Sequence, residues 1–514
     1  MNKNQTIPQI KIGIIQATDN VTFSCDCNFS IIDLSGKLLF SGEAENGYEL
    51  KINTSQPATI LYQIRVASYK DKKQAIKKLN SLIKQDLKAR IRTVGIKMAF
   101  GERIIDNRDY WVTINNFTSK EEANKFAREN VLLNDTIIVE EIKETASGEI
   151  YLGSQNLGDR FTITPSTTNA LINVANVPIG IEFHWQRQET LAYRGRIEVG
   201  FNNDGRLAVI NELDIESYLT SVNSSEMTPD CPLSLLEAQT VAARSTVFAT
   251  MGKHHYNTNY HLCSDDHCQC YQGAKREQEI SRQAIENTYG EILMYGNEVC
   301  DARYSKICGG IMESYNNVWE EWDVPYLMAG VDSDQPIDFP ANTEKKAKKL
   351  IDSDTPSFCN TNLHQLPEKL ANLYSTKNLF RWKVIYEREE LEEIIAQKLK
   401  TDLGELQEIK PLNRGPSGRL IYIELIGSKQ NIKIGKELEI RRVLSKSYLY
   451  SSCFYVEKEI ANDGKVKRFI LKGAGWGHGV GLCQVGAAVM ALNKYLYEDI
   501  LKHYYKNTKI LKLY

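Results

Sequence analysis

Histidine and cysteine are concentrated in one short segment of this chain. The sequence holds eight histidines and eleven cysteines, and seven of these residues lie between positions 254 and 270. The seven are His254, His255, His261, Cys263, His267, Cys268 and Cys270. Because zinc prefers imidazole and thiolate ligands, metal binding is the first interpretation of this cluster, and chance enrichment in a loop is the alternative.

The spacing inside the cluster does not settle the question of metal binding. No two of its cysteines have the C-x2-C spacing of common zinc sites. Cys263 and Cys268 are the best candidate thiolates, and His255 or His261 is the best candidate imidazole. The pattern leaves open whether zinc is bound.

A glutamate about 30 residues upstream is a second candidate for chemistry. Asp214 is a good helix N-cap, and an apolar stripe follows it at helical spacing: Ile215, Tyr218, Leu219 and Val222. Glu226 continues this stripe at the end of the predicted helix 215–226, where partial burial would favour the protonated form of a carboxyl group. Such a group can act as a general acid near neutral pH. An exposed glutamate at a fraying helix end fits the same pattern.

A second helix is predicted between Pro232 and Gly252. One of its faces carries mostly small residues, which permit close packing: Leu235, Ala238, Ala242, Ser245 and Ala249. Arg244 lies off this face, and the pattern favours solvent exposure over a polar cleft for its side chain.

Near the C-terminus, glycine occupies every second position of a nine-residue stretch: Gly473, Gly475, Gly477, Gly479 and Gly481. Without side chains at these positions, the backbone can approach a sugar chain closely. Trp476 could then stack on a pyranose ring, and His478 and Gln484 could bond its polar groups. A tight bulged strand inside the core is the alternative interpretation.

An internal repeat marks a small module near the N-terminus. Residues 62–75 and 110–123 align at an offset of 48, and each predicts a strand, a polar turn and a helix. With further strands at 91–98 and 135–142, they predict an α+β module of about 85 residues.

The rest of the chain divides around this module. Strands are predicted on both sides of it, at 11–16, 28–34, 47–52, 160–164, 179–183, 194–201 and 207–213, so the module looks inserted into a larger β-containing unit. Residues 332–378 are polar and predict a long connection. A strand at 381–386, a helix at 387–400 and a strand pair at 419–426 and 429–434 follow.

Length and charge exclude several classes of protein. A chain of 514 residues accommodates roughly three domains, and its net charge of -2 gives no general reason to bind nucleic acid. No segment predicts an export signal or a membrane span. An odd number of cysteines cannot all pair within one chain, which favours a thiol-rich protein.

Four segments together resemble the SpoIID/LytB family. SVNSSEMTPDCPLSLLEAQTVAARSTVFA (221–249) resembles its signature block, and HLCSDDHCQCYQG (261–273) its Cys-rich segment. YSKICGGIMESYNNVW (304–319) and GAGWGHGVGLCQVGAAVMA (473–491) are similar to its two later blocks. The four blocks occur in the family's order, which makes the signal much stronger than any one of them.

This resemblance implies a lytic transglycosylase that cuts peptidoglycan glycan strands, with Glu226 as its general acid. It also implies that zinc, where present, is structural, since the reaction needs no metal-activated water. The residues expected to bind substrate are Arg244, His267, Gln269, Tyr271, Ser305, Gly309, Gly310, Trp476, His478 and Gln484. Cys483 stands where the family usually has Ser, and Lys306, Ile307 and Met312 are further departures.

The repeat module is similar in its order of elements to the SPOR domain, a family that binds peptide-stripped glycan. The expected fold is therefore α+β, a SpoIID-like mixed unit with a SPOR-like insertion. The expected division is 1–58 (β-rich), 59–145 (SPOR-like), 146–331 (catalytic core), 332–378 (connection) and 379–514 (C-terminal part).

Two other functions remain open from the sequence. The chain could be a cell-wall-binding amidase enhancer that does not cut glycan, or a cytosolic metal or redox protein built on the His/Cys cluster. The transglycosylase and amidase-enhancer functions both imply glycan strands as partner and an extracytoplasmic location, and a cell-wall amidase is a further candidate partner. The absence of a visible leader fits the third function better.

Overall fold

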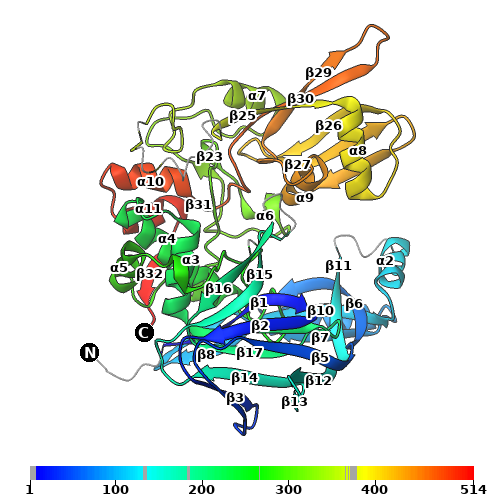
Figure 1. The fold of residues 1–514 in the computed structure, drawn as a ribbon. Helices are drawn as coiled ribbons and strands as arrows, with labels where there is room; N and C mark the ends of the chain where they lie inside the picture. Colours follow the sequence, from blue (N-terminus) through cyan, green and yellow to red (C-terminus); the bar gives the residue numbers. More distant parts are fainter. Residues whose placement is uncertain are drawn as a thin grey trace.

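The structure is a computed structural model that describes residues 7–130, 136–181, 186–265, 267–364, 366–367, 370 and 379–514. It mixes helices with several sheets, as the sequence predicts. Figure 1 shows the N-terminal sheets at one end and the C-terminal sheets at the other. Within the described ranges, no helix has both the length and the apolar character needed to cross a membrane.

The N-terminal end contains two large, mainly antiparallel sheets. The first has the order β19-β1-β18-β17-β14-β3-β4, with β1 (Gln9–Thr18), β3 (Phe29–Asp33), β4 (Leu38–Gly42), β14 (Arg160–Pro165), β17 (Arg196–Phe201), β18 (Leu207–Asp214) and β19 (Leu262–Cys263). The second has the order β13-β12-β5-β2-β15-β16, with β2 (Asn20–Cys25), β5 (Tyr48–Gln56), β12 (Ser147–Leu152), β13 (Gln155–Asn156), β15 (Ile172–Ile179) and β16 (Arg187–Tyr193). The strand predicted at 179–183 is wrong: β15 ends at Ile179, and 182–183 lie outside the described residues.

The first sheet positions both candidate sites. β1 pairs with β18 from Gln9 opposite Asp214, and Asp214 is the residue that caps the next helix. On its other edge β1 pairs with β19, which places Cys263 beside Gly13. The predicted catalytic helix follows β18 and the His/Cys segment contains β19, and these two strands lie on either side of β1 in one sheet.

Residues 59–144 form a separate sheet with the order β11-β6-β10-β7. Its elements are β6 (Thr59–Tyr69), α1 (Lys72–Ile83), β7 (Ala89–Val94), β10 (Asp109–Phe117), α2 (Lys120–Glu129) and β11 (Ile137–Glu144). The two helices begin at equivalent points of the repeat, because Asp71 and Ser119, 48 residues apart, both accept a hydrogen bond from the first turn. The module leaves and rejoins the chain between β5 and β12, which pair with each other.

One strand of this module differs from the prediction. The sequence predicts a single strand at 91–98, but the chain turns at Gly95, which has a φ of 88°. The segment is thereby divided into β7 and β8 (Lys97–Phe100), and β8 pairs with β9 (Arg103–Asp106) in a separate hairpin.

The two predicted helices begin where the sequence predicts, but the second is more deeply buried than predicted. α3 (Ile215–Glu226) is capped by Asp214, whose side chain accepts from the amide of Ser217 at 2.9 Å. α4 (Leu233–Thr250) begins after Pro232, as predicted. α4 is buried on all sides from Leu235 to Thr250, so the prediction of a solvated face around Arg244 is wrong.

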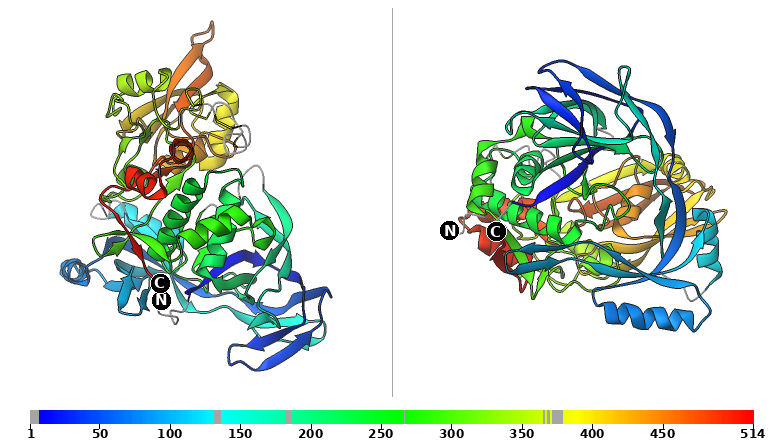
Figure 2. Two further views of the ribbon diagram at one scale, coloured as in Figure 1. Left: turned by 90° about the vertical axis from the view of Figure 1, so that its left-hand side faces the viewer. Right: turned by 90° about the horizontal axis from the view of Figure 1, so that it is seen from below.

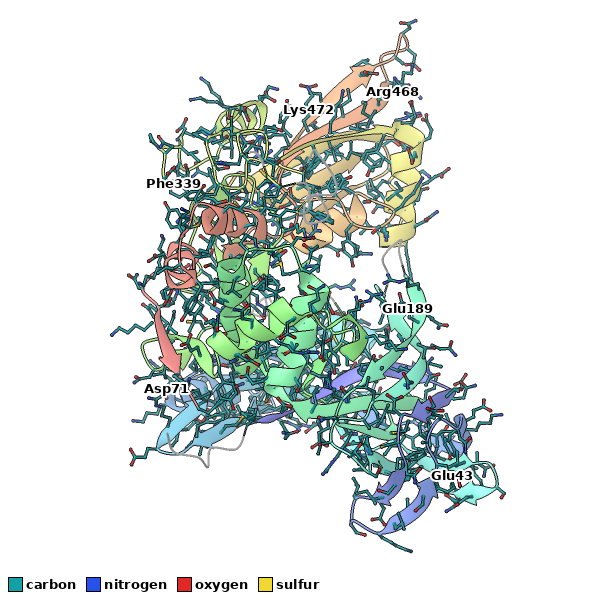
Figure 3. The ribbon with its side chains drawn as sticks, turned by 60° about the vertical axis from the view of Figure 1, so that its left-hand side comes forward. Glu43, Asp71, Glu189, Phe339, Arg468 and Lys472 are labelled. Atoms are coloured by element: carbon teal, nitrogen blue, oxygen red, sulfur yellow. The ribbon has the colours of Figure 1, made fainter. Side chains whose placement is uncertain are left out.

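The C-terminal end contains two small sheets with a hydrophobic core of their own. Their strands and covering helices are β25 (Arg381–Glu387), α8 (Arg388–Leu399), β26 (Leu406–Arg414), β27 (Leu420–Gly427), β28 (Asn431–Gly435), α9 (Glu437–Val443), β29 (Phe454–Ile460) and β30 (Val466–Ala474). Figure 3 shows the β29–β30 hairpin, which carries Arg468 and Lys472, projecting from this end of the molecule.

The interpretation of 332–378 as a surface connection is wrong where the structure describes it. The segment contains α7 (Glu344–Asp352), and Asp332, Cys359 and Asn360 within it are fully buried. Positions 365, 368–369 and 371–378 lie outside the described residues.

The end of the chain returns to the central helices. α10 (Gln484–Leu492) and α11 (Tyr497–Tyr504) pack against α4, and Figure 2 shows them in red beside it. β32 (Lys509–Lys512) then pairs with β20 (Glu291–Tyr295).

Candidate active site

Glu226 is the last residue of α3. Its side chain is half-buried, whereas the next residue, Met227, is buried. The backbone N–H of Cys270 donates a hydrogen bond to Oε1 of Glu226 at 3.2 Å. The His/Cys segment therefore holds the carboxyl group from the side.

The segment around Tyr304 lies on another side of Glu226. Burial raises the pKa of Tyr304, and the charge of Glu226 adds to this effect. Burial lowers the pKa of Lys306, and the nearby Glu226 carboxylate opposes that shift. Tyr304 and Ser305 form β22, which pairs in parallel with β31 (Leu482–Cys483) and so connects this side to the glycine-rich segment.

His478 belongs to a group of rings and cations in the glycine-rich segment. Its ring lies 4.8 Å from that of Trp319, and the Arg303 guanidinium lies 5.2 Å from the centre of the Trp319 ring. The amide of Val480 donates to Nδ1 of His478 at 3.0 Å, so this nitrogen carries no proton. Burial, with Arg303 and Arg419 as further causes, lowers the pKa of His478 to about 3. His478 is therefore a neutral imidazole at neutral pH.

This pKa predicts an acid-dependent loss of stability. In an unfolded chain His478 takes up a proton below its ordinary pKa of 6.5, whereas in the folded protein it does so only near 3. The free energy of unfolding should therefore fall as pH drops from 6.5 toward 3, by at most about 1.4 kcal/mol per pH unit from this residue. Urea unfolding across this range should show a shallower slope for His478→Gln than for wild type, and parallel slopes would contradict the assignment.

The alternating glycines serve backbone packing within the protein. Gly475, Gly477, Gly479 and Gly481 all have φ between 70° and 95°. A Cβ at Gly481 would lie 2.0 Å from the carbonyl oxygen of Arg303. The spacing thus reflects a tight backbone conformation against β22, as in the core-packing alternative. Trp476 is half-buried, and its ring lies edge-on to Tyr450.

Several other predicted substrate contacts are buried in the protein. Ser305 and Gln484 are at most 7% exposed. Gly309 and Gly310 are buried, with φ of 85° and 109°, and Gly309 packs against Ala474 and Gly475. The described contacts of these four residues are internal.

Arg244 is fully buried and forms an ion pair with Glu216. Its Nε and Nη2 donate to the two carboxylate oxygens of Glu216 at 2.9 and 2.6 Å, and Nη1 donates to the carbonyl of Glu291. The sequence prediction of a substrate contact does not fit this geometry, because any such contact would have to break a buried ion pair.

Gln269 and Tyr271 likewise stabilise the core. Gln269 accepts from the hydroxyl of Tyr218 and donates to the carbonyl of Ala243, and the Tyr271 hydroxyl donates to Asn211. Each is 2% exposed. These contacts indicate that the two residues support the wall of the cleft, whereas the sequence predicted that they bind substrate.

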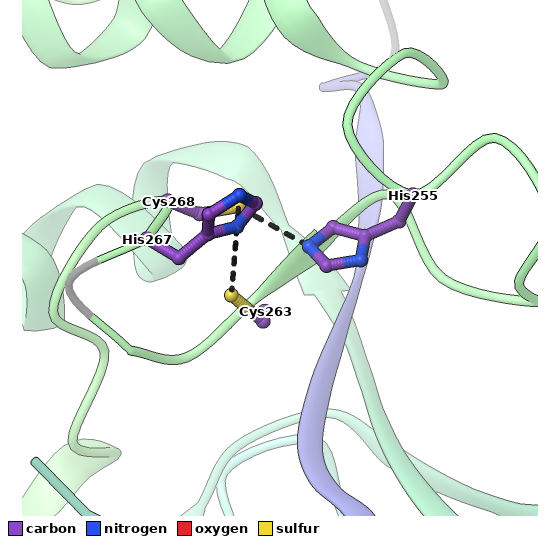
Figure 4. A group of neighbouring side chains, drawn as sticks. All are labelled: His255, Cys263, His267 and Cys268. Carbon is purple, nitrogen blue, oxygen red and sulfur yellow. Dashed lines mark hydrogen bonds between the residues drawn. The ribbon is translucent and has the colours of Figure 1, made fainter. Parts of the chain in front are cut away.

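His255, Cys263, His267 and Cys268 converge on one point (Figure 4). Their four ligand atoms all lie within 4.8 Å of one another. Sγ of Cys268 lies 3.4 Å from Nε2 of His255 and 3.6 Å from Nδ1 of His267. In a tetrahedral zinc site, a sulfur and a nitrogen ligand are about 3.6 Å apart. The donor set and its dimensions fit one zinc ion.

The observed ligand set differs from the predicted one at one histidine. Both predicted thiolates and His255 are present, but Nδ1 of His261 accepts from the amide of Lys11 at 3.1 Å, so His261 supports β1 instead. His267, which the sequence assigned to substrate, takes the fourth position. A hydrogen bond from Cys268 lowers the pKa of Cys263, and the same contact raises the pKa of Cys268.

The two histidines should therefore respond differently to substitution. His267→Ala removes one of four ligands and should lose about one equivalent of zinc from the purified protein, whereas His261→Ala should keep it. Zinc measured by mass spectrometry of the acid-digested protein decides between them. The reverse result would restore the ligand set predicted from sequence.

Sequence reasoning missed Arg303 and Trp319 as parts of this site. Arg303 precedes the resembling block YSKICGG, and Trp319 ends it. Besides contacting Trp319, Arg303 pairs with Asp301 at 2.8 Å and lies 3.4 Å from Nε2 of His254. Arg303 therefore connects the His/Cys segment to the group around His478. The spacing of these residues in the sequence does not reveal this connection.

The Glu226 carboxyl group is thus bound by the Cys270 amide of the His/Cys segment and lies near Tyr304 and Lys306. Comparison with known proteins supports the resemblance. Residues 203–295 match the family model described as stage II sporulation protein, and residues 313–481 match a domain of unknown function, DUF8618. Residues 203–295 are therefore a SpoIID-family domain. This match contains Glu226 and the whole His/Cys segment.

Individual relatives match a longer part of the chain at low sequence identity. An uncharacterized protein of Brachyspira hyodysenteriae is 29% identical over 65% of this chain and 76% of its own length. The amidase enhancer of Bacillus subtilis is 27% identical over 57% of this chain, a match that spans only 40% of that relative. Stage II sporulation protein D of Bacillus amyloliquefaciens is 23% identical over 59% of this chain and 75% of its length.

Proposed function

We propose that this protein is a peptidoglycan lytic transglycosylase with Glu226 as its catalytic acid. The observation that carries the proposal is the position of Glu226: half-buried at the end of a rigid helix, held by the Cys270 amide and facing Lys306 and Tyr304. A carboxyl group so placed can exchange protons with a bound molecule, while the hydrogen bond fixes its orientation.

The reaction needs only this one carboxyl group. Glu226 gives its proton to the glycosidic oxygen between N-acetylmuramic acid and N-acetylglucosamine, and the bond from the anomeric carbon to that oxygen breaks. The 6-hydroxyl of the muramic acid then bonds to the anomeric carbon, and its proton passes to the Glu226 carboxylate. Because the nucleophile belongs to the substrate, proximity lowers the barrier without a second carboxylate.

A zinc ion held by His255, Cys263, His267 and Cys268 would have a structural role in this scheme. Cys268 lies two residues before Cys270, whose amide orients Glu226. The ion would crosslink the loop, and the loop positions the hydrogen bond to the acid. If the metal-free protein stays folded, it should keep measurable activity.

Lys306 favours glycan whose stem peptides have been removed. Once the peptide is cut from muramic acid, the lactyl group ends in a free carboxylate. Lys306 places a half-buried amine beside Glu226, close to where the cleaved bond must lie. A charged hydrogen bond of this kind stabilises a complex by about 1.5–3 kcal/mol.

Replacing Lys306 by methionine should therefore reduce the preference for stripped glycan. We expect the ratio of cleavage rates on stripped and intact glycan to fall by about tenfold or more. The exposed Lys275→Met variant serves as the control and should leave this ratio unchanged. An equal loss on both substrates would indicate that Lys306 acts on the acid rather than on the lactyl group.

The module at 59–144 would add affinity for the same polymer, as its SPOR-like order of elements suggests. Other parts of the chain cover some of its sheet: Tyr256 packs against Trp111, and Glu320 pairs with Arg65. A cavity of about 600 Å³ beside this contact is lined by polar groups, among them Arg90 and Glu141. These groups are the ones we expect to contact glycan, so that binding there tethers the catalytic domain to its substrate.

The proposed substrate implies a place in the cell envelope, and the names of the relatives agree with such a role. The relative named amidase enhancer keeps the non-catalytic alternative open and makes a cell-wall amidase the expected partner. Incubation of the purified protein with cell walls separates the two functions. A catalytic protein releases soluble glycan and Glu226→Gln does not, whereas a pure binding protein sediments with the wall and releases nothing in either form.

A further inference from the structure

A second cluster of metal-type ligands lies in the interior, apart from the His/Cys segment. Cys308, Asp332, Cys359 and Cys483 are each at most 2% exposed, and their ligand atoms all lie within 4.8 Å of one another. These residues come from four separate segments of the chain. From this convergence, we propose that the four residues bind a second zinc ion. The family matches and the relatives described above do not assign such a site.

The distances fit a single ion. Sγ of Cys308 lies 3.2 Å from Oδ2 of Asp332 and 3.6 Å from Sγ of Cys359. Ligands of one tetrahedral zinc ion are about 3.5–3.8 Å apart, whereas an iron–sulfur cluster would hold its cysteines farther from one another. Three thiolates with one carboxylate suit zinc, and their total charge equals that of a four-cysteine zinc site.

The groups around the cysteine sulfur atoms suit thiolates. Backbone amides point at two of the thiols: Cys308 N and Gly486 N donate to Sγ of Cys483 at 3.3 and 3.5 Å, and Gly310 N donates to Sγ of Cys308 at 3.4 Å. Such donors stabilise metal-bound thiolates. They also give Gly310, which the sequence assigned to substrate, a contact inside the protein.

Asp332 has the outer contacts expected of a metal-binding carboxylate. Its Oδ1 accepts from the Tyr504 hydroxyl at 2.8 Å and lies 3.4 Å from Nε2 of His503, which leaves Oδ2 directed toward Cys308. A Cβ on Gly486 would lie 2.6 Å from that Oδ2, so the start of α10 fits against the carboxylate only as glycine. A carboxylate this deeply buried requires compensation, which a cation supplies.

A disulfide explains less of this arrangement. Cys308 and Cys359 would have to move from 3.6 Å to about 2.05 Å to form one, and Cys483 and Asp332 would then have no role. Cys483 is the residue that replaces the Ser of the resembling family. Its thiol is the ligand that this replacement supplies.

The position of the cluster suggests what the ion would do. Cys308 and Cys483 lie just outside the two ends of the 313–481 match, whereas Asp332 and Cys359 lie within it. The ion would fasten the region at 313–481 to the core where its two ends meet. It would also fix the backbone two residues from Lys306, which lies near Glu226.

Zinc content tests the proposal on the full chain. After loading with zinc and removal of the excess, wild type should hold two equivalents, and Cys359→Ser and Cys263→Ser should each hold one. Cys300→Ser is the matched control, because Cys300 is equally buried and belongs to neither cluster, and it should keep both. If Cys359→Ser held as much zinc as wild type, the proposal would be overturned, whatever the content of Cys263→Ser.

Two further readouts cover variants that fail to fold. Asp332→Asn keeps the size of the side chain and should also lower zinc content by one equivalent, with the Cys263 site still filled. Non-reducing digestion of wild type should recover Cys308 and Cys359 as separate thiol peptides. A disulfide-linked Cys308–Cys359 peptide would overturn the proposal. These results do not depend on glycan cleavage, so the second site and the proposed function can fail separately.

Discussion

Replacing Glu226 by glutamine should lower the rate of glycan cleavage by roughly 10²–10⁴-fold, the usual contribution of a general acid or base. The amide keeps the shape of the side chain and can still accept from the Cys270 amide, but it can neither give nor take the proton. Because Glu226 is half-buried at a helix end, the fold should be unaffected. The rate is measured as soluble glycan released from peptide-stripped cell wall.

Asp230→Asn is the matched control for this prediction. Asp230 is exposed, lies four residues after Glu226 and loses the same charge on substitution. It should keep wild-type activity. If Glu226→Gln kept more than about a tenth of the wild-type rate while remaining folded, another residue would have to be the acid.

Replacing Arg244 by methionine should destabilise the protein by about 3–5 kcal/mol, because it leaves the carboxylate of Glu216 buried without its partner. Arg244 is fully buried and Glu216 nearly so. Urea unfolding followed by circular dichroism measures the loss. The matched control is Arg282→Met, which removes an exposed ion pair with Glu279 and leaves the buried Glu277 paired with Arg194. It should change the free energy of unfolding by less than about 1 kcal/mol.

The double variant Arg244→Met with Glu216→Leu separates a structural role from substrate binding. With both charges removed, most of the stability should return. Activity per folded molecule should return with it, because Arg244 does not touch the substrate in this account. A stable double variant that has lost glycan affinity would show that the sequence-based assignment of Arg244 was right.

The local structure of the site was predictable from sequence because short-range physics determines it. The cap at Asp214, the apolar stripe and the proline at 232 set the ends of α3 and α4, and the structure confirms both helices. The repeat offset likewise predicted the two capped helices of the inserted module. Neither feature depends on distant parts of the chain.

Burial and partnership were harder to predict, because they depend on residues far apart in the sequence. Arg244 looked solvated because its partner Glu216 lies 28 residues away on another helix. His261 was predicted as a ligand and His267 as a substrate contact, because the sequence does not show that Lys11 in the first strand binds His261. Cys359 stood in a polar stretch, and only the fold brings it to Cys308 and Cys483.

The central claim is that Glu226 drives an intramolecular cleavage without added water. The most direct measurement is mass spectrometry of the products that wild type releases from peptide-stripped glycan in H₂¹⁸O. The account predicts fragments that end in a 1,6-anhydro sugar and carry no ¹⁸O, with no such fragments from Glu226→Gln. Reducing ends labelled with ¹⁸O would contradict it, because they would require water as the nucleophile.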